Sequence, residues 1–239
     1  MRILSWDIGI INLSYCIIEK NENTNEILHW GIINLMETSE MKKNRNLLFE
    51  NIPKKLYELP FLLEVDKVVI ENQPSLKNPQ MKSIQMIVYS YFLMYGKILN
   101  ENEYKIKNID FCNASNKLKV YKGPEIILVK RIRKEKKNND KLENNLENNL
   151  ENNLENKLEN NLEDEKINES DEKNKEEKSN KKIKAPKLTY NDKKKMAVEH
   201  VKFFLKDDQK NFDFFLNHKK KDDLADSYLQ GLYVLKYKY

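Results

Sequence analysis

The chain has 239 residues, a net charge of +5, an apolar fraction of 39% and a mean hydropathy of −0.80. No apolar run approaches the roughly 20 residues of a membrane span, and Asp7 interrupts the apolar N-terminal segment, so we expect neither a transmembrane helix nor a signal peptide. Cys16 and Cys112 lie far apart and the three histidines are scattered, which argues against a disulfide framework and a structural zinc site, so we expect an intracellular protein of a reducing compartment.

The polarity is concentrated in residues 131–184, where only 9 residues are apolar. The remainder has an ordinary globular composition and carries the positive charge, which favours a polyanionic partner. Within the segment, leucines between 142 and 162 recur in a Leu-Glu-Asn-Asn repeat, a period that fits no heptad seam. We expect a single domain over residues 1–239, interrupted by a low-complexity, disordered insertion at about 131–184, with a functional coiled coil as the alternative.

The N-terminal region predicts three strands, at residues 2–8, 13–19 and 26–34. Each is rich in β-branched or aromatic residues and is bounded by Gly or Asn-rich turns. Short connections between them indicate a meander of antiparallel hairpins.

The next region changes from strand to helical spacing. Leucines predict a helix over residues 42–64, which Pro53 and Pro60 should interrupt or kink. Residues 67–71 form a short apolar run, typical of a strand that is buried on both faces. Residues 80–99 predict a helix that is apolar almost all round, and such a helix is either central or at an interface.

Three further elements complete the prediction: a fifth strand at residues 104–111 and helices at 190–205 and 222–236. The order of strands and helices predicts an α/β fold with a mixed five-stranded sheet flanked by helices. We expect the aromatic residues between positions 203 and 215 to belong to the core rather than to a base-stacking platform. They are Phe203, Phe204, Phe212, Phe214 and Phe215.

Two carboxylates follow buried strands. Asp7 ends the first strand, and Glu71 ends the strand at 67–71, where open α/β sheets place their sites. Either acid alone could cap a turn. Both together would carry a desolvation cost that a cation or another partner must offset.

A third group of acids opens the last helix. Asp223 and Asp226 are three residues apart and share one helix face, although acids in a first turn also interact favourably with the helix dipole. Four carboxylates without histidine or cysteine select hard oxygen-liganded cations, Mg²⁺ or Mn²⁺. The sequence therefore predicts a metal site formed by Asp7, Glu71, Asp223 and Asp226, with Asp222 as a substitute for Asp223.

Two classes of protein begin with a strand that ends Asp-x-Gly and continues into a hairpin: actin-like ATPases and sugar kinases, and ribonuclease H-like nucleases. The ATPases need several Gly-rich loops for the backbone to approach phosphate. This chain has five glycines, none of them paired, which favours the nuclease.

Three motifs carry a resemblance to Holliday-junction resolvases of the RuvC type, with the poxvirus and yeast mitochondrial resolvases most similar. They are Asp-Ile-Gly-Ile-Ile-Asn-Leu-Ser at 7–14, Val-Ile-Glu-Asn-Gln-Pro at 69–74 and Lys-Asp-Asp-Leu-Ala-Asp-Ser at 221–227. The resemblance spans roughly residues 1–125 and 187–235. It implies a ribonuclease H-like nuclease that binds four-way DNA junctions as a homodimer and makes paired, symmetric nicks.

The resemblance also implies roles for individual residues. Asp7 and Glu71 take the first two metal-binding positions, and Asp223 and Asp226 the final pair. Two Mg²⁺ ions, or Mn²⁺, would activate the water and stabilise the leaving oxygen. We expect basic side chains near this site to contact phosphates, although lysines are often simply solvated. They are Lys117, Lys119, Lys122, Lys219, Lys220 and Lys221.

Alternatives remain at this stage. The same fold could cut flaps or RNA–DNA hybrids, or bind junctions without catalysis. The homodimer is expected through the helix at 80–99, unless the C-terminal helices cover its second face within one chain. The high Lys, Asn and Ile content is typical of an A+T-rich genome, and the poxvirus-like motifs favour a large DNA virus and its cytoplasmic factory, with the mitochondrion as the alternative.

Overall fold

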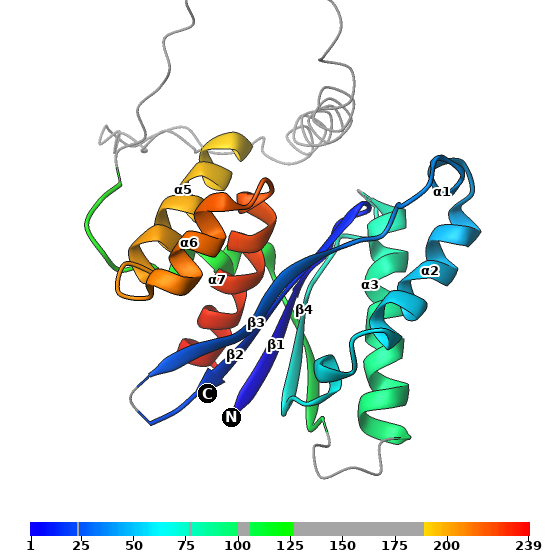
Figure 1. Ribbon diagram of the computed structural model, residues 1–239, viewed down its shortest axis with the longest axis horizontal. Helices are drawn as coiled ribbons and strands as arrows, with labels where there is room; N and C mark the ends of the chain where they lie inside the picture. Colours follow the sequence, from blue (N-terminus) through cyan, green and yellow to red (C-terminus); the bar gives the residue numbers. More distant parts are fainter. Residues whose placement is uncertain (23, 77, 100–105, 127–188) are drawn as a thin grey trace, which may run out of the picture. The chain divides into compact units, whose positions relative to one another are not determined.

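A five-stranded sheet in the order β3-β2-β1-β4-β5 forms the centre of the computed structural model, which describes residues 1–22, 24–76, 78–99, 106–126 and 189–239 (Figure 1). Strands β1 (Arg2–Asp7), β2 (Asn12–Lys20) and β3 (Asn25–Asn34) pair antiparallel as a meander. Strands β4 (Lys67–Glu71) and β5 (Asn108–Cys112) extend the sheet in parallel with β1. The sheet is therefore mixed, as the sequence predicts.

One face of the sheet is covered by the helices that lie between β3 and β5. They are α1 (Ser39–Lys43), α2 (Arg45–Tyr57), the 3-10 turn η1 (Pro60–Leu63) and α3 (Pro79–Tyr91). Helix α2 continues through Pro53 instead of ending there. Alternate residues of β1 and β4, such as Leu4, Trp6 and Val68, pack into this layer.

The predicted helix at 80–99 changes geometry at its midpoint. After α3 ends at Tyr91, the chain widens into the π-helical segment η2 (Phe92–Ile98), where the N–H of Leu99 donates to the carbonyl of Met94. A π-helical turn inside or beside an α-helix marks a local departure from regular packing. The carbonyl of Gly96 then accepts from the N–H of Ile106, which leads into β5.

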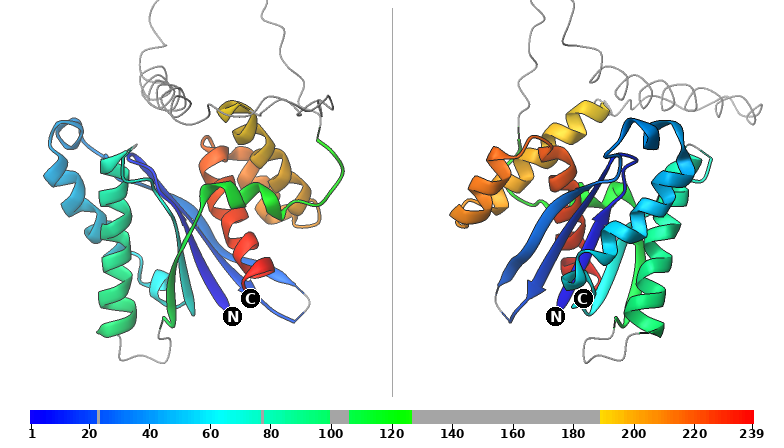
Figure 2. Two further views of the ribbon diagram at one scale, coloured as in Figure 1. Left: turned by 180° about the vertical axis from the view of Figure 1, so that it is seen from behind. Right: turned by 45° about the vertical axis from the view of Figure 1, so that its right-hand side comes forward.

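The other face of the sheet carries the 3-10 segment η3 (Ala114–Val120) and the helices α5 (Tyr190–Phe204), α6 (Gln209–Asn217) and α7 (Lys221–Tyr237) (Figure 2). Helix α6 was not predicted from the sequence. Phe215 is fully buried and stacks on Trp30, as expected of a core residue, whereas Phe203 and Phe214 are about two-fifths exposed, at 39% and 40%. The aromatic segment is thus core only in part.

The outer face of α3 and η2 remains exposed. Met86, Met94 and Tyr95 are 42%, 42% and 45% exposed and line a groove of about 370 Å³ together with Pro53 and Tyr91. The alternative in which the C-terminal helices cover this face is wrong, because α5, α6 and α7 lie on the opposite side of the sheet (Figures 1 and 2).

All the described residues belong to one compact unit. The predicted insertion at 131–184 lies outside the described residues. No helix in the described ranges is long and apolar enough to cross a membrane.

Candidate active site

Asp7 and Glu71 lie side by side at the carboxyl edge of the sheet. Their strands are neighbours and parallel, with Trp6 opposite Ile70, so the two following residues emerge at the same edge. Because side chains alternate along a strand and Trp6 and Ile70 pack toward α2 and α3, both acids face the layer that contains α7. The sequence predicts the position at the sheet edge but not the face.

Helix α7 brings Asp223 and Asp226 to the same edge. Three contacts fix the helix across β1 and β2: the hydroxyls of Ser14 and Ser227 are 2.9 Å apart, and the Gln230 amide donates to Ser5 Oγ at 3.1 Å and to the Trp6 carbonyl at 3.0 Å. Gly231 lets the helix approach closely, since a β-carbon there would lie 3.3 Å from Cβ of Ser5. The first turn of α7 is thereby held over the ends of β1 and β4.

The structure separates Asp222 from Asp223. Asp222 pairs with Lys194 of α5, with Nζ and Oδ2 2.9 Å apart, and the ammonium lowers the pKa of this carboxyl although burial opposes that shift. Asp223 instead accepts a hydrogen bond from the Asn12 amide at 3.3 Å. Of the two adjacent acids, Asp223 is therefore the one that lies, with Asp226, on the side of the strand carboxylates.

Lys117 lies at the centre of the cluster. Its ammonium hydrogen-bonds to Asp7 Oδ1 and lies 3.1 Å from Glu71 Oε1 and 3.3 Å from Asp226 Oδ2. The residue is 4% exposed. The segment η3 turns the side chain inward, among the carboxylates, and the phosphate contact that the sequence predicts for Lys117 stays a prediction. In this structure Lys117 links carboxylates from β1, β4 and α7.

The carboxylates are crowded beyond what one ammonium can neutralise. Burial raises the pKa of Glu71 to about 8, and Lys117 only partly opposes the shift. Burial and the nearby Asp7 raise the pKa of Asp223 to about 7, and burial raises that of Asp226 to about 6. Burial would lower the pKa of Lys117, but the three acids that contact it, Asp226, Asp7 and Glu71, hold this pKa well above its usual value.

The donor set fits a hard divalent cation. Four carboxylates supply only oxygen atoms, which Mg²⁺ and Mn²⁺ prefer, and their raised pKa values show a site in need of more positive charge. Within the described ranges, however, no three Asp, Glu, His or Cys side chains already have the spacing of ligands around one metal ion. Lys117 occupies the position between them.

The remaining predicted lysines differ in exposure. Lys119, Lys122, Lys219 and Lys220 are exposed, and Lys119 donates to the Asn116 side chain at 2.8 Å. Lys221 is partly buried and donates to the His218 carbonyl at 2.9 Å. The four exposed side chains are accessible to a polyanion.

Two glutamines that were not predicted as site residues connect to Glu71, Gln73 directly and Gln85 through Gln73. The amide of Gln73 donates to Glu71 Oε2 at 2.8 Å, and the backbone N–H of Gln73 donates to Oε1 of Gln85 at 2.8 Å. The only sequence signal is that Gln73 follows Glu71 by two residues, within the motif at 69–74.

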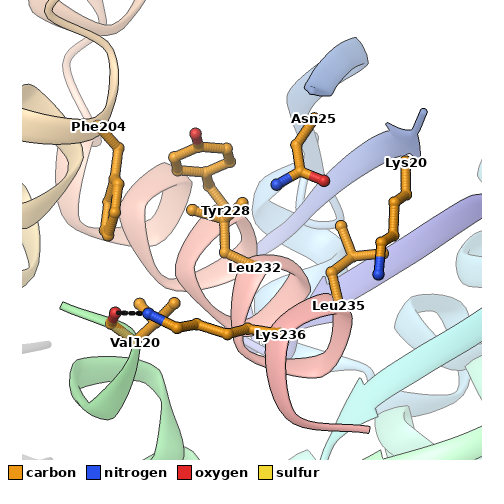
Figure 3. A pocket seen from close by; sticks show the side chains of 8 residues that line it. All are labelled: Lys20, Asn25, Val120, Phe204, Tyr228, Leu232, Leu235 and Lys236. Atoms are coloured by element: carbon orange, nitrogen blue, oxygen red, sulfur yellow. Dashed lines mark hydrogen bonds between the residues drawn. The ribbon is translucent and has the colours of Figure 1, made fainter. Parts of the chain in front are cut away.

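A second hollow, of about 410 Å³, lies elsewhere on α7 (Figure 3). Its lining includes Phe204, Tyr228 and Leu232, and the Lys236 ammonium donates to the Val120 carbonyl at 3.4 Å. The residues that line it include no carboxylate, so it is distinct from the acidic cluster.

Comparison with known proteins gives one sequence relative and several solved structures. No family model matches the chain. An uncharacterized protein of Acanthamoeba polyphaga mimivirus, L451, is 29% identical over 227 residues, which cover 93% of this chain but 42% of the relative. The chain thus spans less than half the length of that protein.

The structural likenesses are to junction-resolving enzymes. The fowlpox virus resolvase in complex with its substrate Holliday junction DNA is 16% identical over 99% of this chain and 97% of that one, with a TM-score of 0.50. The fowlpox virus Holliday junction resolvase in a second structure gives 14% identity over 100% of both chains, also with a TM-score of 0.50. The yeast mitochondrial resolvase Ydc2 is 16% identical over 97% of this chain and 78% of that one, with a TM-score of 0.47.

The fowlpox likenesses cover nearly the whole chain, including the mixed five-stranded sheet and the helices on both of its faces. At these identities they report on the fold. The chain has a ribonuclease H-like fold of the Holliday-junction resolvase type.

Proposed function

We propose that this protein is a Holliday-junction resolvase, a metal-dependent endonuclease that makes paired, symmetric nicks in four-way DNA junctions. The observation that carries the proposal is the meeting of Asp7, Glu71, Asp223 and Asp226 at one edge of the sheet. The fold shared with the fowlpox enzyme supports the choice of substrate class.

Phosphodiester hydrolysis needs an activated water and a stabilised leaving oxygen, and two bound Mg²⁺ or Mn²⁺ ions supply both. The four carboxylates would hold these ions. Lys117 keeps the carboxylates close together without the ions, and its ammonium would interact with a phosphate that reached this position. The contacts of α7 with β1 and β2 fix Asp223 and Asp226 in position relative to the strand carboxylates.

DNA binding is assigned to the exposed lysines. Lys119 lies in η3 and Lys122 follows it, whereas Lys219 and Lys220 precede α7, so the four lysines adjoin the elements that carry Lys117 and the pair Asp223 and Asp226. Phosphate contacts of this kind fix the position of the duplex without reading its sequence. The structure-specific recognition would then come from the shape of the junction.

Paired nicking needs two sites, and we assign the second to a partner copy that binds through the outer face of α3 and η2. That face exposes Met86, Met94, Tyr95, Ile98 and Leu99. A two-fold dimer presents identical sites to the equivalent strands of a symmetric junction. The mimivirus relative supports a setting in a large DNA virus.

The test uses purified protein with a synthetic four-way junction, a flap and an RNA–DNA hybrid, each in Mg²⁺ or EDTA. We expect symmetric nicks in the junction alone, and only with Mg²⁺. Asp7→Asn, Glu71→Gln and Asp226→Asn should abolish nicking while junction binding stays near wild type, because each removes charge from the metal site but not from the lysines.

The outcomes separate the alternatives. Cleavage of the flap or the hybrid at a similar rate would assign the fold to a different nuclease activity. Tight junction binding without cleavage under any metal condition would indicate a non-catalytic junction-binding protein. A variant that still nicks at a substantial fraction of the wild-type rate would show that its carboxylate was wrongly assigned.

A further inference from the structure

We propose that Gln73 and Gln85 are positioning residues that fix the carboxylate of Glu71 for cation binding. The inference rests on the proposed function, because it assumes a cation at the carboxylate cluster. It adds a second layer of side chains, from the β4–α3 connection and from α3 itself, to the residues that determine metal affinity.

The two oxygens of Glu71 have different partners. Oε1 lies 3.1 Å from the Lys117 ammonium and belongs to the cluster, whereas Oε2 accepts the Gln73 amide at 2.8 Å. Rotation of the carboxylate would break one of these contacts or both. Gln73 therefore holds one oxygen away from the cluster and leaves the other toward Asp7 and Asp226.

An amide suits this position better than a cation would. Gln73 donates a hydrogen bond without bringing a positive charge, so it does not compete with a metal ion for the Glu71 carboxylate. A lysine or arginine there would compete for the same charge. Partners of this kind orient ligands in metal sites, and their loss typically weakens metal binding about 10- to 100-fold.

Gln85 in turn fixes Gln73. Its Oε1 accepts the backbone N–H of Gln73 at 2.8 Å and the Lys82 ammonium at 3.2 Å. Gln85 is fully buried, at 0% exposure, and its Nε2 has no hydrogen-bond partner in the part of the chain that the structure describes. An apolar side chain of similar volume would avoid that unpaired amide group, so the effect of Gln85 is to place Gln73 rather than to stabilise the core.

The experiment measures metal binding on protein without DNA. Mn²⁺ is titrated by calorimetry into wild type, Gln73→Met, Gln85→Met and Glu71→Gln, and thermal unfolding in EDTA is recorded for each. Gln80→Met is the matched control, because Gln80 lies on α3, as Gln85 does, and is partly exposed. Methionine preserves side-chain volume and removes the amide.

We expect Gln73→Met to weaken Mn²⁺ binding about 10- to 100-fold, with Gln85→Met shifted in the same direction by less and Gln80→Met unchanged. Nicking by Gln73→Met should then recover at high Mg²⁺, since a mispositioned ligand changes affinity more than the chemistry. Thermal unfolding in EDTA should stay close to wild type for Gln73→Met.

Wild-type Mn²⁺ affinity in Gln73→Met, alongside loss of binding in Glu71→Gln, would overturn the inference and leave the proposed function standing. Wild-type affinity in Glu71→Gln would instead refute the metal site itself. If Gln73→Met does not fold, Gln85→Met decides, and unchanged affinity in that variant overturns the inference.

Discussion

Lys117 shows how local geometry decides the role of a residue. In a 3-10 segment, residues three apart lie on the same side, so Lys117 and Val120 are both buried while Lys119 is exposed. The sequence around them contains lysines at alternating positions and gives no sign of which one turns inward. The burial of Lys117 depends on carboxylates that lie far away in the sequence.

Removing the Lys117 ammonium should destabilise the metal-free protein. Lys117→Met leaves Asp7, Glu71 and Asp226 without their shared partner, and breaking a buried ion pair in this way costs about 3–5 kcal/mol. We expect the loss in the free energy of unfolding, measured by urea denaturation in EDTA, to be partly restored by Mg²⁺. Lys119→Met is the control and should change little. Equal stability of Lys117→Met and wild type in EDTA would contradict this assignment.

The two adjacent acids of α7 should differ in their effect on nicking. Asp222→Asn breaks the pair with Lys194 and leaves the cluster intact, so the rate at saturating Mg²⁺ should stay within a few-fold of wild type. Asp223→Asn removes a carboxylate next to Asp7 and should reduce the rate at least about tenfold more, a difference of roughly 1.4 kcal/mol in the barrier. Single-turnover rates check the order, and the reverse order would assign Asp222 to the site.

At the scale of elements, β1 to β4 follow their predicted bounds within one or two residues because their hydrophobic runs are bounded by turn residues. Helix α6 had no comparable signal. Its nine residues, 209–217, contain several poor helix formers, and a helix this short depends on tertiary packing, here on Phe215 against Trp30.

The candidate site likewise has a part that the sequence predicts and a part that it does not. Asp7 and Glu71 could be placed from the sequence because strand ends and side-chain alternation are local properties. The inward turn of Lys117, the bond between Gln73 and Glu71 and the separation of Asp222 from Asp223 arise from contacts between elements, which spacing does not encode.

Helix α5 provides a test of pH dependence. His200 is 2% exposed and stacks on Tyr121 with ring centroids 4.1 Å apart, and burial lowers its pKa below the ordinary value of 6.5. As the pH falls through 6.5, the unfolded chain takes up a proton on His200 before the folded chain does. The stability that neutral His200 contributes is therefore present above that pH and lost below it.

We expect His200→Phe, which keeps an aromatic ring beside Tyr121, to flatten this dependence. Between about pH 7.5 and about pH 5.5, the wild type should lose more free energy of unfolding than the variant. Comparing the two by urea denaturation removes the contribution of the carboxylate cluster, which they share. Parallel curves over this range would show that His200 does not titrate differently in the folded state.

At the scale of the whole molecule, the exposed face of α3 and η2 predicts assembly. Met94→Glu places a charge on an apolar surface that a partner copy would bury, so the variant should be monomeric in sedimentation at micromolar concentration and should no longer make paired nicks. Leu216→Glu, on α6 at the other side of the sheet and 37% exposed, is the control and should remain dimeric. A monomeric wild type with intact paired nicking would refute the dimer.

The contacts that fix α7 on the sheet join residues at opposite ends of the sequence. Ser14 and Ser227 are separated by 213 positions, and Ser5 and Gln230 by 225. Contacts this distant form slowly, because a long loop must close before they stabilise the chain. The first and last described residues nevertheless lie side by side (Figures 1 and 2). A circular permutant that joins them and opens the chain within 131–184 would make α7 and β1 consecutive, so its acidic edge should assemble early in folding rather than last.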